Sequence, residues 1–228
     1  MTARLSSCAL ALFLLLVPSA HLAAQSDEAD RVKESAFVLN EIMKAADSAI
    51  PTSVLSKAEG IAIFPSTVRG GFIVGAERGR GILSVRDEKT RMWSTPAFLT
   101  ITGGSVGLQI GVRATDLVLV IQNRRGLENL VRNQFKLGAD LGVAAGPVGR
   151  EAQAATDLQL RAQILSYSRA RGLFAGVTVN GSTIRQDRDA NERFYGKRLE
   201  AQQILFDPAT VAPSAVTAWV DTLKRFAL

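Results

Sequence analysis

Apolar and polar residues alternate along the middle of the chain, and a period of two predicts β-strands. From 103 to 112 the apolar residues fall on one side of an extended strand, and Gly107, Gln109 and Gly111 fall on the other. Glycine weakens a strand interior unless another segment comes close, so we expect this strand to pack tightly or to lie at a barrel corner. Eighteen of the 19 glycines lie between residues 60 and 181. The pattern therefore predicts a glycine-rich β core.

Further strands follow from the same reading. They are expected at 61–64, 72–76, 82–86, 98–102, 117–121, 162–168, 173–179 and 183–186. Pro65 is expected to end the first of them, and the polar stretch 77–81, with two glycines, is expected to form a turn. The continuous apolar run 117–121 predicts a strand that is buried on both faces. Asn180-Gly181 predicts a hairpin between the last two strands.

Helical periodicity appears on both sides of this β region. Val32, Ala36, Leu39 and Met43 form one apolar stripe and predict a helix over 27–49. We expect it to pack on the sheet, because its charged face mixes acidic and basic residues; the alternative is a helix that lies on a membrane surface. Shorter helices are expected at 51–59, 126–134, 189–195, 199–205 and 214–226. The predicted fold class is α+β: a strongly twisted, Gly-rich antiparallel sheet or partial barrel, with flanking helices at the N- and C-terminal ends.

Residues 1–24 have the pattern of a cleaved signal peptide. Arg4 precedes an apolar run at 9–17 that is too short to span a bilayer, and small residues follow it. The only cysteine, Cys8, and the only histidine, His21, both lie in this segment. A mature chain of 25–228 would therefore have no disulfide, no thiolate nucleophile and no Cys/His metal site. We expect one exported domain in the periplasm or cell envelope, with a helical extension at its C-terminal end and without cofactor or metal.

The formal net charge of +6 favours an anionic partner. Five arginines beside glycines or near predicted strand ends are candidates for binding lipid phosphates: Arg69, Arg78, Arg80, Arg169 and Arg171. If their loops project from one end of the sheet, they form a positive rim; the alternative is a set of scattered surface arginines. Aromatic residues are only 6% of the chain, so a stacking platform for nucleic acid is not expected.

One short motif raises the possibility of catalysis. The stretch Gly103-Gly-Ser-Val-Gly107 matches G-x-S-x-G, the nucleophile elbow of α/β-hydrolases. That motif needs a strand, a sharp turn and a helix, whereas the residues after Ser105 alternate as a strand. The mature chain would also lack a histidine to activate Ser105. A serine hydrolase is therefore a minor alternative, and the main expectation is a protein that is not an enzyme.

Several longer motifs, in the same order, resemble the SYLF domain, also described as the yeast actin-regulator and lipid-binding domain. They include Lys57-Ala-Glu-Gly-Ile-Ala-Ile-Phe-Pro65, Gly75-Ala-Glu-Arg-Gly-Arg-Gly81, Trp93-Ser-Thr-Pro-Ala-Phe98, Gly104-Ser-Val-Gly-Leu-Gln-Ile-Gly111 and Arg171-Gly-Leu-Phe-Ala-Gly176. The resemblance spans about residues 30 to 196, which is most of the chain. With its apparent signal peptide, the chain looks like a stand-alone bacterial version of the domain.

The resemblance implies a non-catalytic domain that binds phosphoinositides or other anionic phospholipids at a membrane surface. Some relatives of the domain also bind actin. Together with the net charge, this predicts that the protein binds anionic membrane lipids. The alternative is a protein-interaction or scaffolding module with a protein partner.

Overall fold

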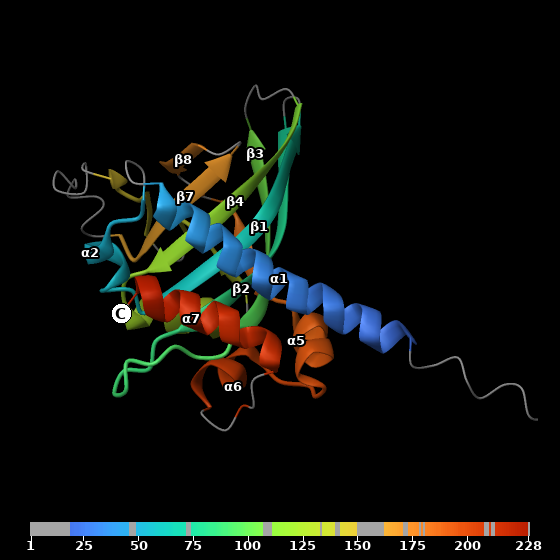
Figure 1. The fold of residues 1–228 in the computed structure, drawn as a ribbon. Coiled ribbons are helices and arrows are strands. Elements are labelled where there is room, and N and C mark those ends of the chain that lie inside the picture. The colour runs from blue at the N-terminus through green and yellow to red at the C-terminus, as the bar shows by residue number, and fades with distance from the viewer. Residues whose placement is uncertain are drawn as a thin grey trace, which may run out of the picture.

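The structure, a computed structural model, describes most of the chain between residues 19 and 227. The described residues are 19–45, 49–71, 74–106, 111–132, 134–139, 142–149, 162–170, 173–177, 179, 181–207, 210 and 213–227. They form one long, curled, open sheet with helices packed against it (Figure 1). The predicted α+β class, with a strongly twisted sheet and helices at both ends of the chain, is confirmed.

Four long strands form the centre of the sheet. They are β1 (Gly60–Gly71), β2 (Val74–Val85), β3 (Ala97–Val106) and β4 (Gly111–Ile121). The shorter strands are β5 (Gln134–Lys136), β6 (Val143–Ala145), β7 (Ile164–Ala170), β8 (Leu173–Gly176) and β9 (Thr183–Gln186). The described strands are ordered β5-β9-β3-β2-β1-β4-β7-β6, and β8 pairs with β7. All of these pairs are antiparallel except the β6–β7 pair.

The helices lie before, between and after the strands. They are α1 (Ser19–Lys44), α2 (Thr52–Leu55), α3 (Arg124–Arg132), α5 (Arg188–Tyr195), α6 (Ala201–Phe206) and α7 (Thr217–Phe226), preceded by the short 3-10 helix η2 (Ser214–Val216). In Figure 1, α1 crosses the sheet diagonally and α7 lies beside it, so the two ends of the described chain meet on one face. Part of α1, residues 19–24, falls in the segment interpreted as a signal peptide, and that interpretation remains a prediction.

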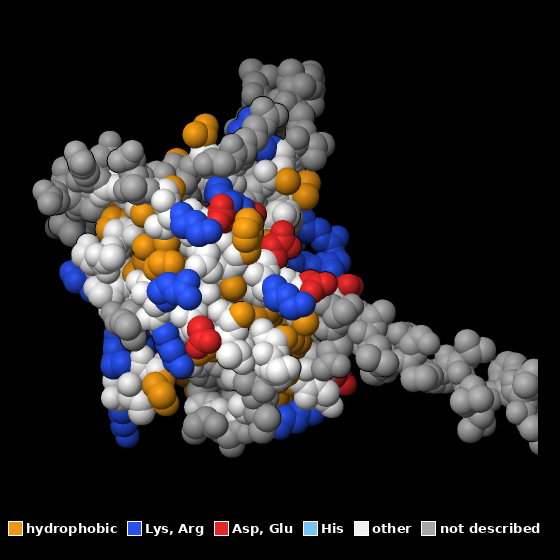
Figure 2. Space-filling view, in the orientation of Figure 1, with side chains coloured by type: hydrophobic (Ala, Val, Ile, Leu, Met, Phe, Trp, Pro, Cys, Tyr) orange, Lys and Arg blue, Asp and Glu red, His pale blue; other side chains and the backbone are white. Residues whose placement is uncertain are grey.

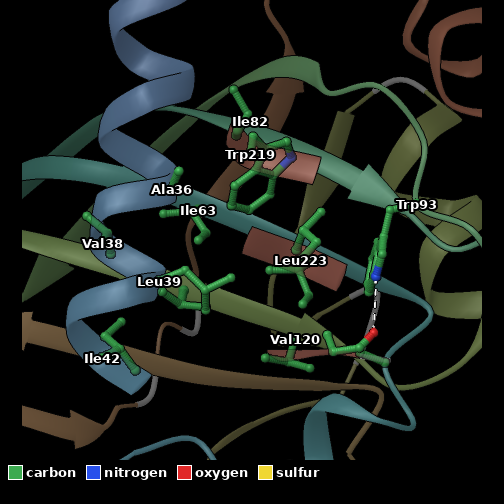
Figure 3. Close-up of a cluster of buried hydrophobic side chains, with 14 of the residues drawn as sticks. Ala36, Val38, Leu39, Ile42, Ile63, Ile82, Trp93, Val120, Trp219 and Leu223 are labelled. Atoms are coloured by element: carbon green, nitrogen blue, oxygen red, sulfur yellow. Dashed lines mark hydrogen bonds between the residues drawn. The ribbon is translucent and has the colours of Figure 1, made fainter. Parts of the chain in front are cut away.

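Helices cover the central part of the sheet on both faces, and alternate residues of each strand point to opposite faces. On one face, here called the α1 face, Ile63, Ile82 and Val120 pack against side chains of α1 and α7 (Figure 3). On the other face, here the α3 face, Phe64 and Leu119 pack with side chains of α3 and α6. The prediction that 117–121 is buried on both faces is confirmed.

Several predicted boundaries are wrong. The single strand expected over 103–112 is wrong, since β3 ends at Val106 and β4 begins at Gly111, and residues 107–110 lie outside the described residues. Pro65 does not end β1, which continues to Gly71 through an irregularity in its register between Ile63 and Val68. Proline is tolerated inside a sheet at such a bulge, because no regular ladder hydrogen bond is needed there.

The turn expected at 77–81 is the middle of β2, and its glycines have a packing role. A Cβ atom added to Gly81 would lie 2.2 Å from the carbonyl oxygen of Ile63 and 2.5 Å from the ring of Phe64. One added to Gly79 would lie 2.4 Å from the hydroxyl of Thr67. Glycine is therefore needed here because neighbouring groups come too close for a side chain, and a positive φ is not required.

We expect Gly81→Ala to destabilise the protein by about 1–3 kcal/mol, since the new methyl group meets backbone that cannot move away. Gly142→Ala is the matched control, because a Cβ atom at Gly142 would meet nothing within 4 Å. Urea unfolding followed by far-UV circular dichroism measures both. Equal midpoints for the two variants would contradict the packing role of Gly81.

The hairpin expected around Asn180-Gly181 is also wrong. Strand β9 pairs with β3 and β5, whereas β8 pairs with β7 near the opposite end of the sheet. Gly181 does have a positive φ of 86°, so the turn signal is real, but the strands on either side of it have other partners. Asn180 lies outside the described residues. This long-range pairing brings β9 beside the central strands.

Candidate anion-binding site

The bulge in β1 is anchored by a polar contact to the neighbouring strand. Ser66 has a positive φ of 50°, and its backbone N–H donates a hydrogen bond of 2.9 Å to Oδ1 of Asp116 on β4. Bulges bend a strand and increase its twist. Beyond this point the long strands extend past α1 (Figure 1). The ends of β1 and β2 are therefore left without a covering helix on the α1 face.

A groove of about 590 Å³ lies over this uncovered part of the two strands. Its lining combines apolar Pro65, Val68 and Ala76 with the side chains of Arg78 and Arg80. The two arginines are two residues apart on one strand, so both lie on the α1 face. Both are exposed, and neither forms an ion pair with any other residue that the structure describes. The groove therefore offers two available guanidinium groups beside an apolar floor.

The other sequence-predicted arginines have different surroundings. Arg69 lies on the α3 face and forms an ion pair of 2.9 Å with Glu77. Arg169 contacts Asp116 at 2.7 Å through both Nε and Nη2, and it lies 5.5 Å from the ring centroid of Phe37. Arg171 lies outside the described residues. The structure therefore brings Arg78 and Arg80 together. Arg69 and Arg169 instead form ion pairs with carboxylates of neighbouring strands.

A third exposed arginine on the same face was missed by sequence reasoning. Arg80 pairs with Thr100 across β2 and β3, and Thr100 pairs with Arg185 across β3 and β9. Directly paired residues of antiparallel strands lie on the same face. Arg185 is exposed, and it forms no ion pair with another described residue. The cationic strip, as we call it, consists of Arg78 and Arg80 on β2 and Arg185 on β9, with Thr100 and Thr102 on β3 between the two strands and Thr183 next to Arg185 on the same face.

A signal for Arg185 was present in the sequence. The stretch 183–186 was expected to be a strand, and in it Ile184 is apolar while its neighbours Thr183 and Arg185 are polar. Arg185 therefore points away from the core that buries Ile184. What the sequence did not reveal was the partner strand, because the Asn-Gly turn suggested pairing with 173–179. The chain positions of Arg80 and Arg185 gave no indication that they are neighbours in the sheet.

An ionic network holds α1 next to the cationic strip. Glu28 is only 1% exposed and accepts a hydrogen bond of 2.8 Å from Arg193 on α5. Arg31 bonds Asp187 at 3.4 Å, at the start of α5. Burial is the main reason why the pKa of Arg31 lies below the ordinary arginine value; Asp187 and Glu28 oppose that effect, and the nearby charge of Arg80 adds to it. The network fixes the helix whose acidic residues border the strip.

These acidic residues limit the positive field at one end of the strip. A second hollow, of about 260 Å³, is lined by Asp27, Asp30, Glu34 and Arg80. Figure 2 shows Asp and Glu side chains next to a group of Lys and Arg side chains at the right-hand edge of this view. Among the described residues, none of these carboxylates forms an ion pair with Arg80. An anionic ligand would therefore be favoured on the side of the strip away from α1.

Among the described residues, no group of three or more His, Cys, Asp or Glu side chains could hold a metal ion. No helix in the described part of the chain is long and apolar enough to cross a membrane. Ser105 lies inside β3, paired with Gly75 of β2, and not in the strand–turn–helix arrangement of a nucleophile elbow. The groove and the cationic strip remain as the surface features that could hold a ligand.

Comparison with known proteins shows the family to which the chain belongs. The chain belongs to the Ysc84 family, described as "Las17-binding protein actin regulator", whose family model matches residues 102–226. The resemblance to the SYLF domain is thereby confirmed. The family's description names binding and regulation.

The relatives extend the match toward the N-terminal end. Protein YSC84 of Saccharomyces cerevisiae is 33% identical over 197 residues, covering 85% of this chain and 42% of the relative. Human SH3 domain-containing YSC84-like protein 1 is 35% identical over 180 residues, covering 76% of this chain and 52% of the relative. LAS seventeen-binding protein 3 of S. cerevisiae is 33% identical over 187 residues, covering 81% and 40%. The chain thus spans about half the length of these relatives.

Proposed function

We propose that this protein is a non-catalytic module that binds anionic phospholipid at a membrane surface through the groove between β1 and β2. The observation that carries the proposal is the pair of exposed arginines, Arg78 and Arg80, which have no ion-pair partner among the described residues and lie beside apolar groove residues. Guanidinium groups hydrogen-bond phosphate oxygens in pairs, which makes arginine well suited to lipid headgroups. The net charge of +6 supports the same partner.

The apolar part of the groove would add a second contribution. Val68 is 46% exposed although it lies on a long strand, and Pro65 and Ala76 line the same hollow. Burying apolar area at the membrane interface contributes roughly 25 cal/mol per Å². Each cation near an anionic surface contributes about 1 kcal/mol, and this part weakens as salt increases. Binding should therefore require anionic lipid and be reduced, but not abolished, by salt.

The proposal predicts that the protein co-sediments with vesicles containing phosphatidylserine and not with vesicles of phosphatidylcholine alone. The double variant Arg78→Gln/Arg80→Gln should lose about 2 kcal/mol, roughly 30-fold in the partition coefficient. Arg125→Gln/Arg198→Gln is the matched control, since both residues are exposed, lie outside the groove and carry the same charge. Equal losses in the two double variants would show that only net charge matters, and absence of binding to anionic vesicles would exclude the lipid function.

A second candidate function is binding to a protein partner. The observation that favours it is the family description, which names Las17 binding, together with the relative named LAS seventeen-binding protein 3. Exposed Phe37 on α1 is a large apolar side chain available to such a partner. Direct binding of purified yeast Las17 to the immobilised protein, with Phe37→Ser as the comparison variant, tests this candidate. No binding of Las17 to the wild-type protein would exclude it.

The predicted signal peptide at 1–24 indicates the compartment in which this protein would bind its partner. We propose that the chain is exported and acts in the cell envelope, where ordinary anionic phospholipids are the available ligands. N-terminal sequencing of the mature protein checks this proposal. A sequence that begins at Met1 would contradict export by cleavage of the predicted segment.

A further inference from the structure

Strand β4 has an open edge where the long strands extend past α1 (Figure 1). Its pairing with β1 runs from Gly111 to Ile121 through the bulge, whereas β7 covers its other side only from Asp116 to Ile121. Among the described residues, no strand pairs with that side of β4 between Gly111 and Thr115. The backbone N–H and C=O groups that face outward here are therefore available to another strand. We call this stretch, residues 111–115, the β4 edge.

On the α3 face, the β4 edge ends a row of charged side chains that is not balanced. Glu77, Arg69 and Arg113 are paired in succession across β2, β1 and β4. Arg69 forms an ion pair of 2.9 Å with Glu77, whereas Arg113 is exposed and forms no ion pair with another described residue. The row thus contains two adjacent cations and one carboxylate, and like charges at directly paired positions are destabilising. A carboxylate on a further strand, opposite Arg113, would compensate for the excess positive charge.

The α1 face of the β4 edge is apolar. Ala114 is exposed and pairs with Val68 of β1, an exposed residue that lines the groove on this face. Phe37 of α1 is also exposed, and it lies against Arg169 at the end of β7, where the β4 edge begins. A strand added to the β4 edge would therefore meet apolar side chains on this face and a cation on the other.

Carboxylates close to the β4 edge are already paired with cations. Asp116 contacts Arg169 at 2.7 Å. Glu41 of α1, whose charge interacts with Arg169, forms an ion pair of 2.9 Å with Lys44. An acidic side chain that approached Arg113 would therefore meet little opposing negative charge.

A second copy of this chain fits the β4 edge poorly. Antiparallel pairing of two such edges about their middle would place Arg113 directly opposite or diagonal to its own copy, and like charges at these positions repel. Proteins commonly use a charged residue on an exposed edge to prevent such pairing. A strand with acidic residues would gain attraction at the position where a second copy meets repulsion.

We propose that the β4 edge is a docking site for an extended segment of a partner protein in which acidic and apolar residues alternate. The segment would add a strand to the sheet through main-chain hydrogen bonds, and its side chains would supply specificity. Successive side chains of a strand point to opposite faces, so the acidic residues would lie beside Arg113 and the apolar residues beside Ala114. This inference does not depend on lipid binding, which is proposed for the groove.

The test uses the full-length protein and a fluorescent synthetic peptide of alternating valine and glutamate residues, with serine at both ends. Fluorescence anisotropy should show binding, and Arg113→Glu should weaken it about tenfold, the value of one charge-assisted hydrogen bond. Arg125→Glu makes the same change of charge at an exposed position of α3, and it should bind the peptide as the wild type does. A peptide with lysine in place of glutamate should bind better to the Arg113→Glu variant than to the wild type. Circular dichroism verifies that each variant is folded.

Hydrogen exchange distinguishes an added strand from simple attraction between charges. The bound peptide should slow exchange of backbone amides within 111–115, and a peptide with proline at its central positions, which lacks N–H donors there, should not bind. Absence of peptide binding would overturn the proposal, as would binding without protection of these amides or an equal loss in the Arg113→Glu and Arg125→Glu variants. Analytical ultracentrifugation of the protein alone tests the other occupant, since a dimer in which 111–115 is protected would overturn the proposal and assign the β4 edge to a second copy. None of these results bears on vesicle binding, so the two proposals fail separately.

Discussion

Replacing Trp219 by alanine is expected to destabilise the protein by about 3–5 kcal/mol, the range typical for removal of a large aromatic side chain from a core. Trp219 is fully buried between α7, α1 and the sheet, where it packs with Leu39 and Ile82 (Figure 3). Its indole N–H also donates a hydrogen bond of 2.8 Å to the hydroxyl of Ser84, which is itself buried. The loss therefore combines a cavity with an unsatisfied polar group.

Trp219→Phe separates these two contributions. Phenylalanine keeps most of the apolar volume and loses the N–H, so it should cost about 1–3 kcal/mol, chiefly for the unsatisfied hydroxyl of Ser84. Urea unfolding followed by far-UV circular dichroism is the appropriate measurement, because it does not depend on tryptophan fluorescence. If Trp219→Ala were no less stable than Trp219→Phe, α7 would not be part of the cooperative core.

The parts of the fold that sequence reasoning predicted are those whose evidence is local. The run 117–121 is apolar at every position, and a short run of this kind is typical of a strand that is buried on both faces. The stripe of Val32, Ala36 and Leu39 likewise indicates a helix and its buried face, and all three are buried in the structure. Local periodicity was sufficient in both cases because burial repeats with the geometry of the element itself.

The wrong predictions concern glycines, because a glycine can be required for two different physical reasons. A glycine permits a turn because it lacks a Cβ atom, and it permits close packing for the same reason. Gly79 and Gly81 were interpreted as turn residues, whereas the structure shows Thr67 and Phe64 pressed against them. Their neighbours across the sheet lie more than ten residues away in the chain, so no local pattern distinguishes the two reasons. At Gly181 the predicted positive φ was correct, but the predicted pairing of the strands on either side of it was wrong.

The candidate site shows the same division between local and long-range information. That Arg78 and Arg80 lie on one face follows from their spacing on one strand, and it could be predicted once 77–81 was known to be extended. That Arg69 and Arg169 are bound to carboxylates depends on Glu77 and Asp116 of neighbouring strands. The place of Arg185 beside Arg80 depends on the β3–β9 pairing. Each of these facts is a property of the sheet register, which composition and periodicity do not specify.

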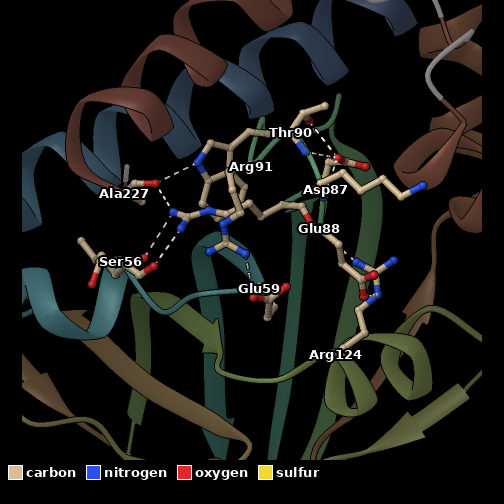
Figure 4. Close-up of polar contacts among 12 residues, drawn as sticks. Ser56, Glu59, Asp87, Glu88, Thr90, Arg91, Arg124 and Ala227 are labelled. Carbon is tan, nitrogen blue, oxygen red and sulfur yellow. Dashed lines mark hydrogen bonds and ion pairs between the residues drawn. The ribbon is translucent and has the colours of Figure 1, made fainter.

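Replacing Arg86 by methionine is expected to destabilise the protein by about 2–4 kcal/mol, because a buried guanidinium ties three separate segments together. Arg86 is only 2% exposed, and burial is the main reason why its pKa lies below the ordinary arginine value. It donates hydrogen bonds to the carbonyl oxygens of Leu55, Ser56 and Ala227, and the last two residues are labelled in Figure 4. Its charge lies 4.7 Å from the ring centroid of Trp93.

The expected loss comes mainly from the carbonyl groups that Arg86→Met would leave behind. In the variant, the carbonyl oxygen of Ala227 still accepts a hydrogen bond of 3.1 Å from the indole N–H of Trp93. The carbonyl oxygens of Ser56 and Leu55, in contrast, lose the hydrogen bonds that the guanidinium group of Arg86 donates to them. Arg91→Met is the matched control, since Arg91 is 46% exposed and its ion pair with Glu59 should contribute less than about 1 kcal/mol. Hydrogen exchange should accelerate at the end of α7 in the Arg86 variant alone. Equal unfolding midpoints for the two variants would mean that relief from burying the charge compensates for the lost hydrogen bonds, and that α7 is held by its apolar face.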